Sequence, residues 1–326
     1  MTGAHKSQSA ARGWIVISIR WGAAIAVLAA LLHFLPVAPL RSALEQVPLT
    51  RFIVILMGYG IAHFFGIIKW RMVVNAAGAE LDFIASAQCY AGGLFGTLFL
   101  PSIVGGDVVR LAVGLRRSPR PAAVFAGNIA DRFLDVCAQG GLVLMGLVLL
   151  PGSVPPQLHS AARHVLLALA ALGILFVILA LLLYKPLFRG RSIRFRRRLA
   201  RLRHALRAVS KRPHILFFCW LLGTGVQALL LVLAALLAIS CGLILPLRIW
   251  LFAWPLAKLA ALLPLTQGGI GVREAALVAL LAPFGAPAPL VLAAGLAWEA
   301  IIIAGNLAAG GVTFLLRHLE SRKVLG

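Results

Sequence analysis

Residues 100–110 read LPSIVGGDVVR, and residues 263–273 read LPLTQGGIGVR. The two stretches share a Leu-Pro pair, a Gly-Gly pair and a final arginine, and every shared position is offset by 163 residues, half the length of the chain. Leu and Gly matches arise easily in this composition, whereas Pro and Arg matches do not. They predict an internal duplication, with repeats at about residues 14–150 and 163–316.

Each motif ends an apolar stretch that differs from the other apolar runs. The stretches are Phe83–Leu100 and Ile249–Leu263, and Pro101 and Pro264 follow or end them. Because proline interrupts a helix and glycine permits unusual backbone angles, we expect each stretch and the segment after it to form a broken helical hairpin. The glycines predicted at the two breaks are Gly105, Gly106, Gly268 and Gly269.

The composition indicates that the chain lies in a membrane. Apolar residues make up 61% of it and charged residues 12%, with a mean hydropathy of +0.98, whereas a soluble domain is about half apolar and about a quarter charged. A soluble enzyme, a disordered protein and a fibrous protein are therefore excluded. The full-length apolar runs are Trp14–Leu35, Phe52–Ile68, Ala122–Leu150, Val165–Leu187, Ile215–Ile239 and Leu290–Leu316.

These runs predict an all-α polytopic membrane protein, with residues 1–326 forming a single integral membrane domain. It would have six full spans and two hairpins. If each broken stretch crosses the bilayer completely, the number of spans rises to eight or more, and both termini stay on the same side.

The basic residues predict the orientation. The chain has 31 Lys and Arg against 9 Asp and Glu. With a cytoplasmic N-terminus and hairpins that return to their own side, 22 basic residues, Lys69 among them, fall on the cytoplasmic side and four fall outside. This is a strong positive-inside signal, which makes both termini cytoplasmic and the two repeats inverted, as in many transporters. Because most basic residues lie between apolar runs, we expect no nucleic acid partner.

A basic linker separates the repeats at residues 189–212. Arginine fills many of its positions, and its apolar residues recur three or four positions apart, at Phe195, Leu199, Leu202, Leu206 and Val209. This spacing predicts an amphipathic helix on the cytoplasmic, anionic face of the membrane. Its role is either to anchor the protein or to dock a lipid or a partner.

Five of the nine acidic residues lie in predicted membrane segments. They are Asp107, Asp131, Asp135, Glu274 and Glu299. A charge at this depth costs at least about 2.5 kcal/mol unless it is paired or hydrated. Oppositely charged neighbours are available, because Arg110, Arg132 and Arg273 each lie one to three residues from a carboxylate. Asp107 is also placed to cap a half-helix at Val108–Arg117.

These charges have two interpretations. In the first, Arg110, Arg132 and Arg273 join the positive ends of the half-helices in a mid-membrane site for an anionic lipid head group. The acidic residues that would balance the charge or couple protons are Asp107, Asp131, Glu274 and Glu299. In the second interpretation, the same charges form a closed salt-bridge network that holds the two halves together.

Other chemistries lack their patterns in this sequence. It contains no HExxH, HxxxH or CxxC spacing, no GxSxG elbow and no P-loop. We therefore expect no metal, no cofactor and no enzymatic activity.

Three motifs together resemble a known family. Residues 100–110, the NIADRFLD stretch at 128–135 and the PLTQGGIGVRE stretch at 264–274 are similar to the lysylphosphatidylglycerol synthase transmembrane family, a flippase-like domain. The resemblance covers about residues 14–316, and the Asp131-Arg132 pair looks like the family's Asp-Arg motif. Glu299 departs from the basic residue that the family pattern would have there. We expect no aminoacyltransferase domain, so synthesis of a lysyl-lipid is not implied.

The resemblance implies a multi-pass protein of the bacterial inner membrane that moves a lipid. Family members occur fused to, or encoded near, enzymes that aminoacylate phosphatidylglycerol, make hopanoids or glycosylate polyprenyl lipids. We therefore expect a translocator that works by alternating access on an anionic, aminoacylated or polyprenyl-type head group, with membrane lipids as its partners. The alternative is a non-transporting accessory subunit that holds a lipid-modifying enzyme or glycosyltransferase at the membrane.

Overall fold

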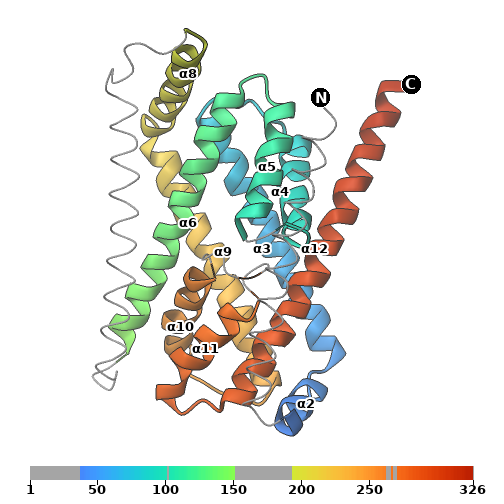
Figure 1. Ribbon diagram of the computed structural model, residues 1–326, viewed down its shortest axis with the longest axis vertical. Helices are drawn as coiled ribbons and strands as arrows, with labels where there is room; N and C mark the ends of the chain where they lie inside the picture. Colours follow the sequence, from blue (N-terminus) through green and yellow to red (C-terminus); the bar gives the residue numbers. More distant parts are fainter. Residues whose placement is uncertain (1–36, 101–102, 151–192, 262–265, 267–269, 326) are drawn as a thin grey trace, which may run out of the picture.

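The computed structural model describes residues 37–100, 103–150, 193–261, 266 and 270–325, and every regular element in these residues is a helix (Figure 1). The helices are α2 Val37–Glu45, α3 Leu49–Ala76, α4 Phe83–Thr97, α5 Ile103–Arg117, α6 Pro121–Leu149, α8 Ile193–Ser210, α9 Pro213–Ser240, α10 Leu247–Ala260, α11 Val272–Leu281, the 3-10 helix η2 Ala282–Phe284 and α12 Ala288–Leu325. The chain is an all-α polytopic membrane protein, as its composition predicts.

Four of these helices are long and apolar enough to cross a membrane. They are α3, α6, α9 and the Ala288–His318 part of α12. They correspond to the predicted spans that begin at Phe52, Ala122, Ile215 and Leu290, and these four predictions are confirmed. The predicted spans Trp14–Leu35 and Val165–Leu187 lie outside the described residues.

Local sequence signals set several helix ends. Pro121 and Pro213 begin α6 and α9, at the position where a missing N–H costs nothing. The carboxylate of Asp82 accepts a hydrogen bond from a backbone N–H in the first turn of α4 and caps that helix. In the turn between α3 and α4, the side-chain amide of Asn75 both donates to and accepts from the backbone of Leu81, at 2.9 Å each. This turn brings α4 back alongside α3.

Two short hairpins lie among the long helices. The helices of the first, α4 and α5, pack against each other, and so do those of the second, α10 and α11. Figure 1 shows the first hairpin in the upper half of the bundle and the second in the lower half, so the two reach the middle from opposite ends. Inverted repeats would have this arrangement; the duplication itself stays a prediction.

The first break differs from the expected one. α5 begins at Ile103, so Gly105, Gly106 and Asp107 lie inside the helix, and Asp107 is not the cap of a half-helix that starts at Val108. The glycines serve close packing instead, because a Cβ at Gly106 would lie 2.6 Å from the carbonyl oxygen of Gly93 in α4. The predicted break residues Pro101, Pro264, Gly268 and Gly269 lie outside the described residues.

Buried apolar side chains form two clusters. One, which includes Trp70 and Val124, joins α3, α4, α6, α8 and α9, and the other, which includes Phe252 and Leu292, joins the lower parts of the long helices to α10 and α11. Large apolar side chains also cover the outside of the bundle; Met57, for example, is 64% exposed. A helix that faces hydrocarbon needs such a surface.

α8 lies within the predicted linker. Its side chains Ala205 and Val209 are buried in the first apolar cluster, while Arg197 and Arg201 are exposed. Figure 1 places α8 at the same end of the bundle as the α5–α6 connection and the C-terminus. The helix therefore turns an apolar face to the bundle and a basic face outward.

Candidate functional site

Six charged side chains from α3, α5 and α6 form one group, which we name the central cluster. Its members are Lys69, Asp107, Arg110, Asp131, Arg132 and Asp135. Three are basic and three are acidic, so their formal charges cancel. Ion pairs at this depth stabilise a fold only when the geometry satisfies both partners.

Lys69 and Asp131 form the most buried part of the central cluster. The Nζ atom of Lys69 lies 2.9 Å from Oδ1 of Asp131 and also pairs with Asp135. Asp131 is inaccessible to solvent, and Lys69 is 4% exposed. Arg132 binds the same two aspartates through Nη2, at 3.2 and 3.1 Å, and its Nε atom lies 3.4 Å from Asp107. These contacts tie α3, α5 and α6 together.

Arg110 has the least satisfied side chain of the central cluster, with two nitrogens that lack a hydrogen-bond partner in the described part of the chain, whereas Asp131 and Arg132 each have one such atom. Asp107 and Asp131 each have an oxygen 3.7 Å from Nη1, which is too long for a hydrogen bond. Nε and Nη1 have no hydrogen-bond partner among the described residues, although Arg110 is only 5% exposed. The Cζ atom lies 4.1 Å from the ring centroid of Tyr90, which covers one face of the guanidinium. The geometry thus holds a buried cation in place while two of its nitrogens lack hydrogen-bond acceptors from the described residues.

Glycines bring Arg110 this close to α4. A Cβ at Gly93 would lie 2.9 Å from the carbonyl oxygen of Gly106 and 3.1 Å from Cβ of Arg110. A larger residue at Gly93 would therefore push α5 away and move the guanidinium. The two backbones approach closely at Gly106, although the break expected there is not present.

A second charged group, which we name the α11 group, consists of Arg273, Glu274 and Glu299. Glu274 accepts a hydrogen bond from Nε of Arg273 at 3.0 Å, and Glu299 accepts one from Nη2 at 2.8 Å. The second oxygen of Glu274 accepts from the backbone N–H of Gly271 at 2.7 Å, which fixes the start of α11. Gly271 has a φ of +84°, a conformation that favours glycine. With one base and two acids, the group has an excess of negative charge.

Two cavities with shared walls lie beside these groups. The first has a volume of about 400 Å³ and is lined by Lys69, Asp107, Arg110, Arg132 and Asp135, among others. The second has a volume of about 420 Å³ and is lined by Tyr59, Trp254, Arg273, Trp298 and Glu299, among others. Both are lined by His63, Leu94, Thr97, Leu230 and Lys258. We name the pair the joined cavities; each volume falls within the range of about 300–1,000 Å³ that ligand pockets occupy.

Lys258 is a further cation on the shared wall. Its Nζ atom donates a hydrogen bond to Oε1 of Gln227 at 2.6 Å. Within the described part of the chain, no carboxylate forms an ion pair with it. The joined cavities are therefore lined by Arg110, two of whose nitrogens lack a hydrogen-bond acceptor, and by Lys258, which has no carboxylate partner among the described residues.

The structure brings most of the predicted site residues together, but in two groups. Arg110, Arg132, Asp107 and Asp131 are in the central cluster, and Arg273, Glu274 and Glu299 are in the α11 group. Asp131 and Glu274 are fully buried behind the cavity walls, whereas the other five line the cavities. Asp131 and Glu274 can thus act only through the arginines or the lysine they bind.

Two members of the central cluster, Lys69 and Asp135, were not among the predicted site residues. Lys69 was expected at the cytoplasmic end of the second span, and this was wrong, because α3 continues to Ala76 and buries it. The apolar residues that follow Lys69, especially Trp70, Val73 and Val74, were the available signal. Asp135 stood out as a charge at membrane depth, but only the structure shows that it shares Lys69 with Asp131.

Comparisons with curated proteins and with solved structures gave no match. A family model does match: it is described as the lysylphosphatidylglycerol synthase TM region, and it covers residues 15–310. The matched range contains both hairpins, the central cluster and the α11 group. The chain therefore belongs to the lysylphosphatidylglycerol synthase TM region family.

Proposed function

We propose that this protein moves a phosphate-bearing lipid between the two leaflets, with the head group passing through the joined cavities. The observation that carries the proposal is Arg110, a buried guanidinium that lines a cavity of about 400 Å³ and whose Nε and Nη1 atoms lack hydrogen-bond partners in the part of the chain that the structure describes. A lipid phosphate in this cavity would supply acceptors once a small shift of the side chain exposed these nitrogens, because a guanidinium forms charge-assisted hydrogen bonds with phosphate oxygens.

The closed-network interpretation accounts for another part of the site. Lys69 forms ion pairs with both Asp131 and Asp135, so we assign these three residues to holding the cavity wall in shape. Arg110 and Lys258 are not satisfied in this way. Because leaving a buried charged donor unpaired costs free energy, their arrangement favours a ligand over a purely structural network.

The placement of the hairpins supports alternating access. The joined cavities are lined by Leu94 and Thr97 from the first hairpin and by Lys258 from the second. A displacement of one hairpin against the other would widen one cavity and narrow the other, and the hairpins reach the middle from opposite ends (Figure 1). Asp107 and Glu299, which line the cavities, would balance the charge of the head group or couple its movement to protons.

We infer that the end carrying α8 faces the cytoplasm of a bacterium, with the protein in the inner membrane. Exposed arginines gather at this end, on α8, at the end of α5 and on the last turns of α12 (Figure 1). The positive-inside rule favours this orientation, and the family resemblance implies the inner membrane. The proposal includes no bond-making step, so the protein would not act as an enzyme.

Liposome reconstitution tests the proposed function. The purified chain is placed in vesicles with head-group-labelled phosphatidylglycerol, phosphatidylethanolamine or polyprenyl phosphate, and a membrane-impermeant quencher is added. Wild type is expected to expose the inner-leaflet label of at least one lipid, whereas R110Q and R273Q, each shown to be folded, are expected to expose none. R248Q is the matched control, because Arg248 is exposed at the opposite end of the bundle from α8. Equal activity of R110Q and wild type would contradict the proposal.

The accessory-subunit alternative has one observation in its favour, the exposed basic face of α8. A folded wild type that moves none of the lipids tested would favour it. In that case, neutralising Arg197 and Arg201 would remove cellular function, whereas R110Q would keep it. A translocator would instead lose cellular function in R110Q and keep it when Arg197 and Arg201 are neutralised. The same set of variants therefore separates the two functions.

A further inference from the structure

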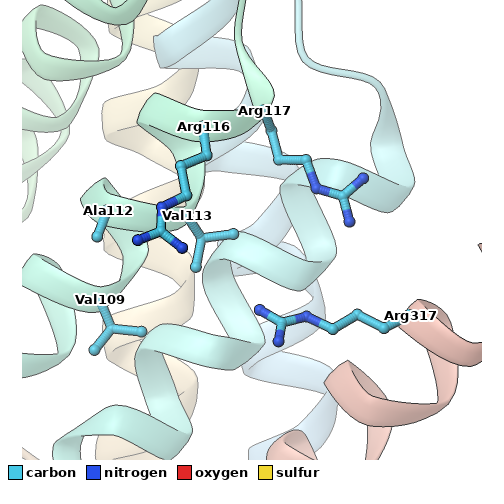
Figure 2. A pocket seen from close by; sticks show the side chains of 6 residues that line it. All are labelled: Val109, Ala112, Val113, Arg116, Arg117 and Arg317. Carbon is cyan, nitrogen blue, oxygen red and sulfur yellow. The ribbon is translucent and has the colours of Figure 1, made fainter.

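We propose that a groove between α5 and α12, separate from the joined cavities, binds an anionic phospholipid of the leaflet at the α8 end. The groove has a volume of about 350 Å³ and is lined by Val109, Ala112, Val113, Arg116, Arg117 and Arg317. Figure 2 shows the three arginines around it, with Arg116 and Arg117 from the end of α5 and Arg317 reaching across from α12.

The charges around the groove are of one sign. Its lining contains three arginines and no acidic residue. Within the described residues, neither Arg116 nor Arg317 takes part in an ion pair. Arginines near the C-terminal end of α5 suit the helix dipole, and all three arginines suit the orientation rule, but neither effect explains why arginines from two helices line one groove that has no acidic residue in its lining. A bound anion does, because it turns their mutual repulsion into attraction.

One of the arginines is held by a buried partner. Oε1 of Gln88, a fully buried residue of α4, accepts a hydrogen bond from Nη2 of Arg117 at 2.6 Å. This contact limits the freedom of the guanidinium before any ligand arrives. Because less side-chain entropy is then lost on binding, the groove is partly preorganised for an anion.

The rest of the groove is apolar and follows α5 away from the charged end. Val109, Ala112 or Val113, and Arg116 lie three or four residues apart and share one helix face. Arg116 lies seven residues after Val109, which corresponds to about 10 Å along the helix axis. The groove is thus charged at one end and apolar along its length, as is a phospholipid with its phosphate at the arginines and its glycerol and upper acyl carbons against the valines.

The neighbouring surface of α5 favours a bilayer lipid over a soluble phosphate. Val108 is 56% exposed and Leu115 is 36% exposed on the same helix. An aqueous ligand would leave these apolar side chains and the valine wall in water, whereas a lipid continues the hydrocarbon that covers the bundle. We therefore assign the groove to a lipid that stays at the protein surface, whichever lipid the joined cavities move.

Lipid retention in detergent tests this site. The full chain is purified, titrated with phosphatidylglycerol and analysed by native mass spectrometry for the number and affinity of bound lipids. In the R116Q/R317Q variant, the affinity of one phosphatidylglycerol is expected to fall about 25-fold, since each arginine near a lipid surface contributes about fivefold. At lipid concentrations that fill this site in the wild type, the variant would therefore carry one phosphatidylglycerol fewer. The R197Q/R201Q variant of α8 removes the same charge from the same end of the bundle and is expected to keep that lipid.

A second variant separates the lipid from a free phosphate. A112W fills the apolar part of the groove and leaves the three arginines, so it is expected to displace phosphatidylglycerol as well. Soluble glycerol 3-phosphate is expected not to displace phosphatidylglycerol from the groove of the wild-type protein or of R197Q/R201Q. Unchanged retention of phosphatidylglycerol by R116Q/R317Q would show that the groove is not a binding site. Normal retention of phosphatidylglycerol by A112W, or its displacement by glycerol 3-phosphate, would show that the groove does not bind a lipid through its apolar part.

Discussion

The guanidinium of Arg110 lies over the ring of Tyr90, with 4.1 Å between Cζ and the ring centroid. The ring face supports the cation without using any of its N–H groups. Tyr90 comes from α4 and Arg110 from α5, so the contact also joins the two helices of the first hairpin. It explains how a buried arginine stays in position while two of its nitrogens lack hydrogen-bond acceptors.

Removal of the ring is therefore expected to reduce transport more than removal of the hydroxyl. Y90L loses the cation–π contact, which is worth about 0.5–2 kcal/mol and corresponds to a roughly two- to thirtyfold weaker interaction with the head group. Y90F keeps the ring and loses only the contact between the hydroxyl and Nδ1 of His63 at 3.3 Å. The quencher assay with labelled lipid measures both variants. Equal losses in Y90F and Y90L would show that the hydroxyl, not the ring face, matters.

The lysine of the central cluster is expected to control stability. K69M would remove one of the two cations that Asp131 and Asp135 share, so that Arg132 alone binds both and the central cluster carries an excess negative charge. Breaking a buried pair in this way costs about 3–5 kcal/mol. Thermal unfolding in detergent should show a large decrease in Tm. K211M is the matched control, because Lys211 is exposed and its loss should leave Tm nearly unchanged.

A second substitution tests the reason for that loss. In K69M/D135N one of the two carboxylates that lost Lys69 is neutral and the formal charges of the central cluster cancel again, so part of the lost stability should return. If the double variant is as unstable as K69M, then packing of the lysine stem, and not charge compensation, is the reason that Lys69 is needed.

Close packing of the first hairpin gives a prediction with a clear control. In G106A the new methyl group would meet the carbonyl oxygen of Gly93 at 2.6 Å, and neither backbone can move without separating α4 from α5. Overpacking of this kind costs about 1–3 kcal/mol. G60A is the control, since a Cβ at Gly60 meets no atom within 4 Å. A decrease in Tm for G106A, with none for G60A, would support the packing role.

Hydropathy and intramembrane charge were enough to predict the helical class, four spans and seven charged residues of the site. The internal position of Gly106 could not be predicted, because its role depends on the carbonyl of Gly93 in another helix. The partners of each charge could not be predicted either. Arg273 binds Glu299, 26 residues further along the chain, and Lys69 binds aspartates more than 60 residues away. Spacing shows which residues share a helix face, but pairing depends on how the helices pack.

The two glutamates that bind Arg273 are expected to have different roles. Glu274 is fully buried and accepts two hydrogen bonds from Arg273 and one from the backbone of Gly271, so E274Q weakens three charge-assisted hydrogen bonds, one of which fixes the start of α11. Such bonds contribute about 1.5–3 kcal/mol each, and Tm should decrease clearly.

Glu299 lines the second cavity, and in E299Q the guanidinium of Arg273 still binds Glu274. We therefore expect E299Q to fold with a Tm near that of wild type and to change the rate of lipid movement or its dependence on pH. Each variant is the control for the other, measured by thermal unfolding and the quencher assay. The same loss of Tm in both variants would mean that Arg273 needs both carboxylates for folding, and it would remove the basis for a transport role of Glu299.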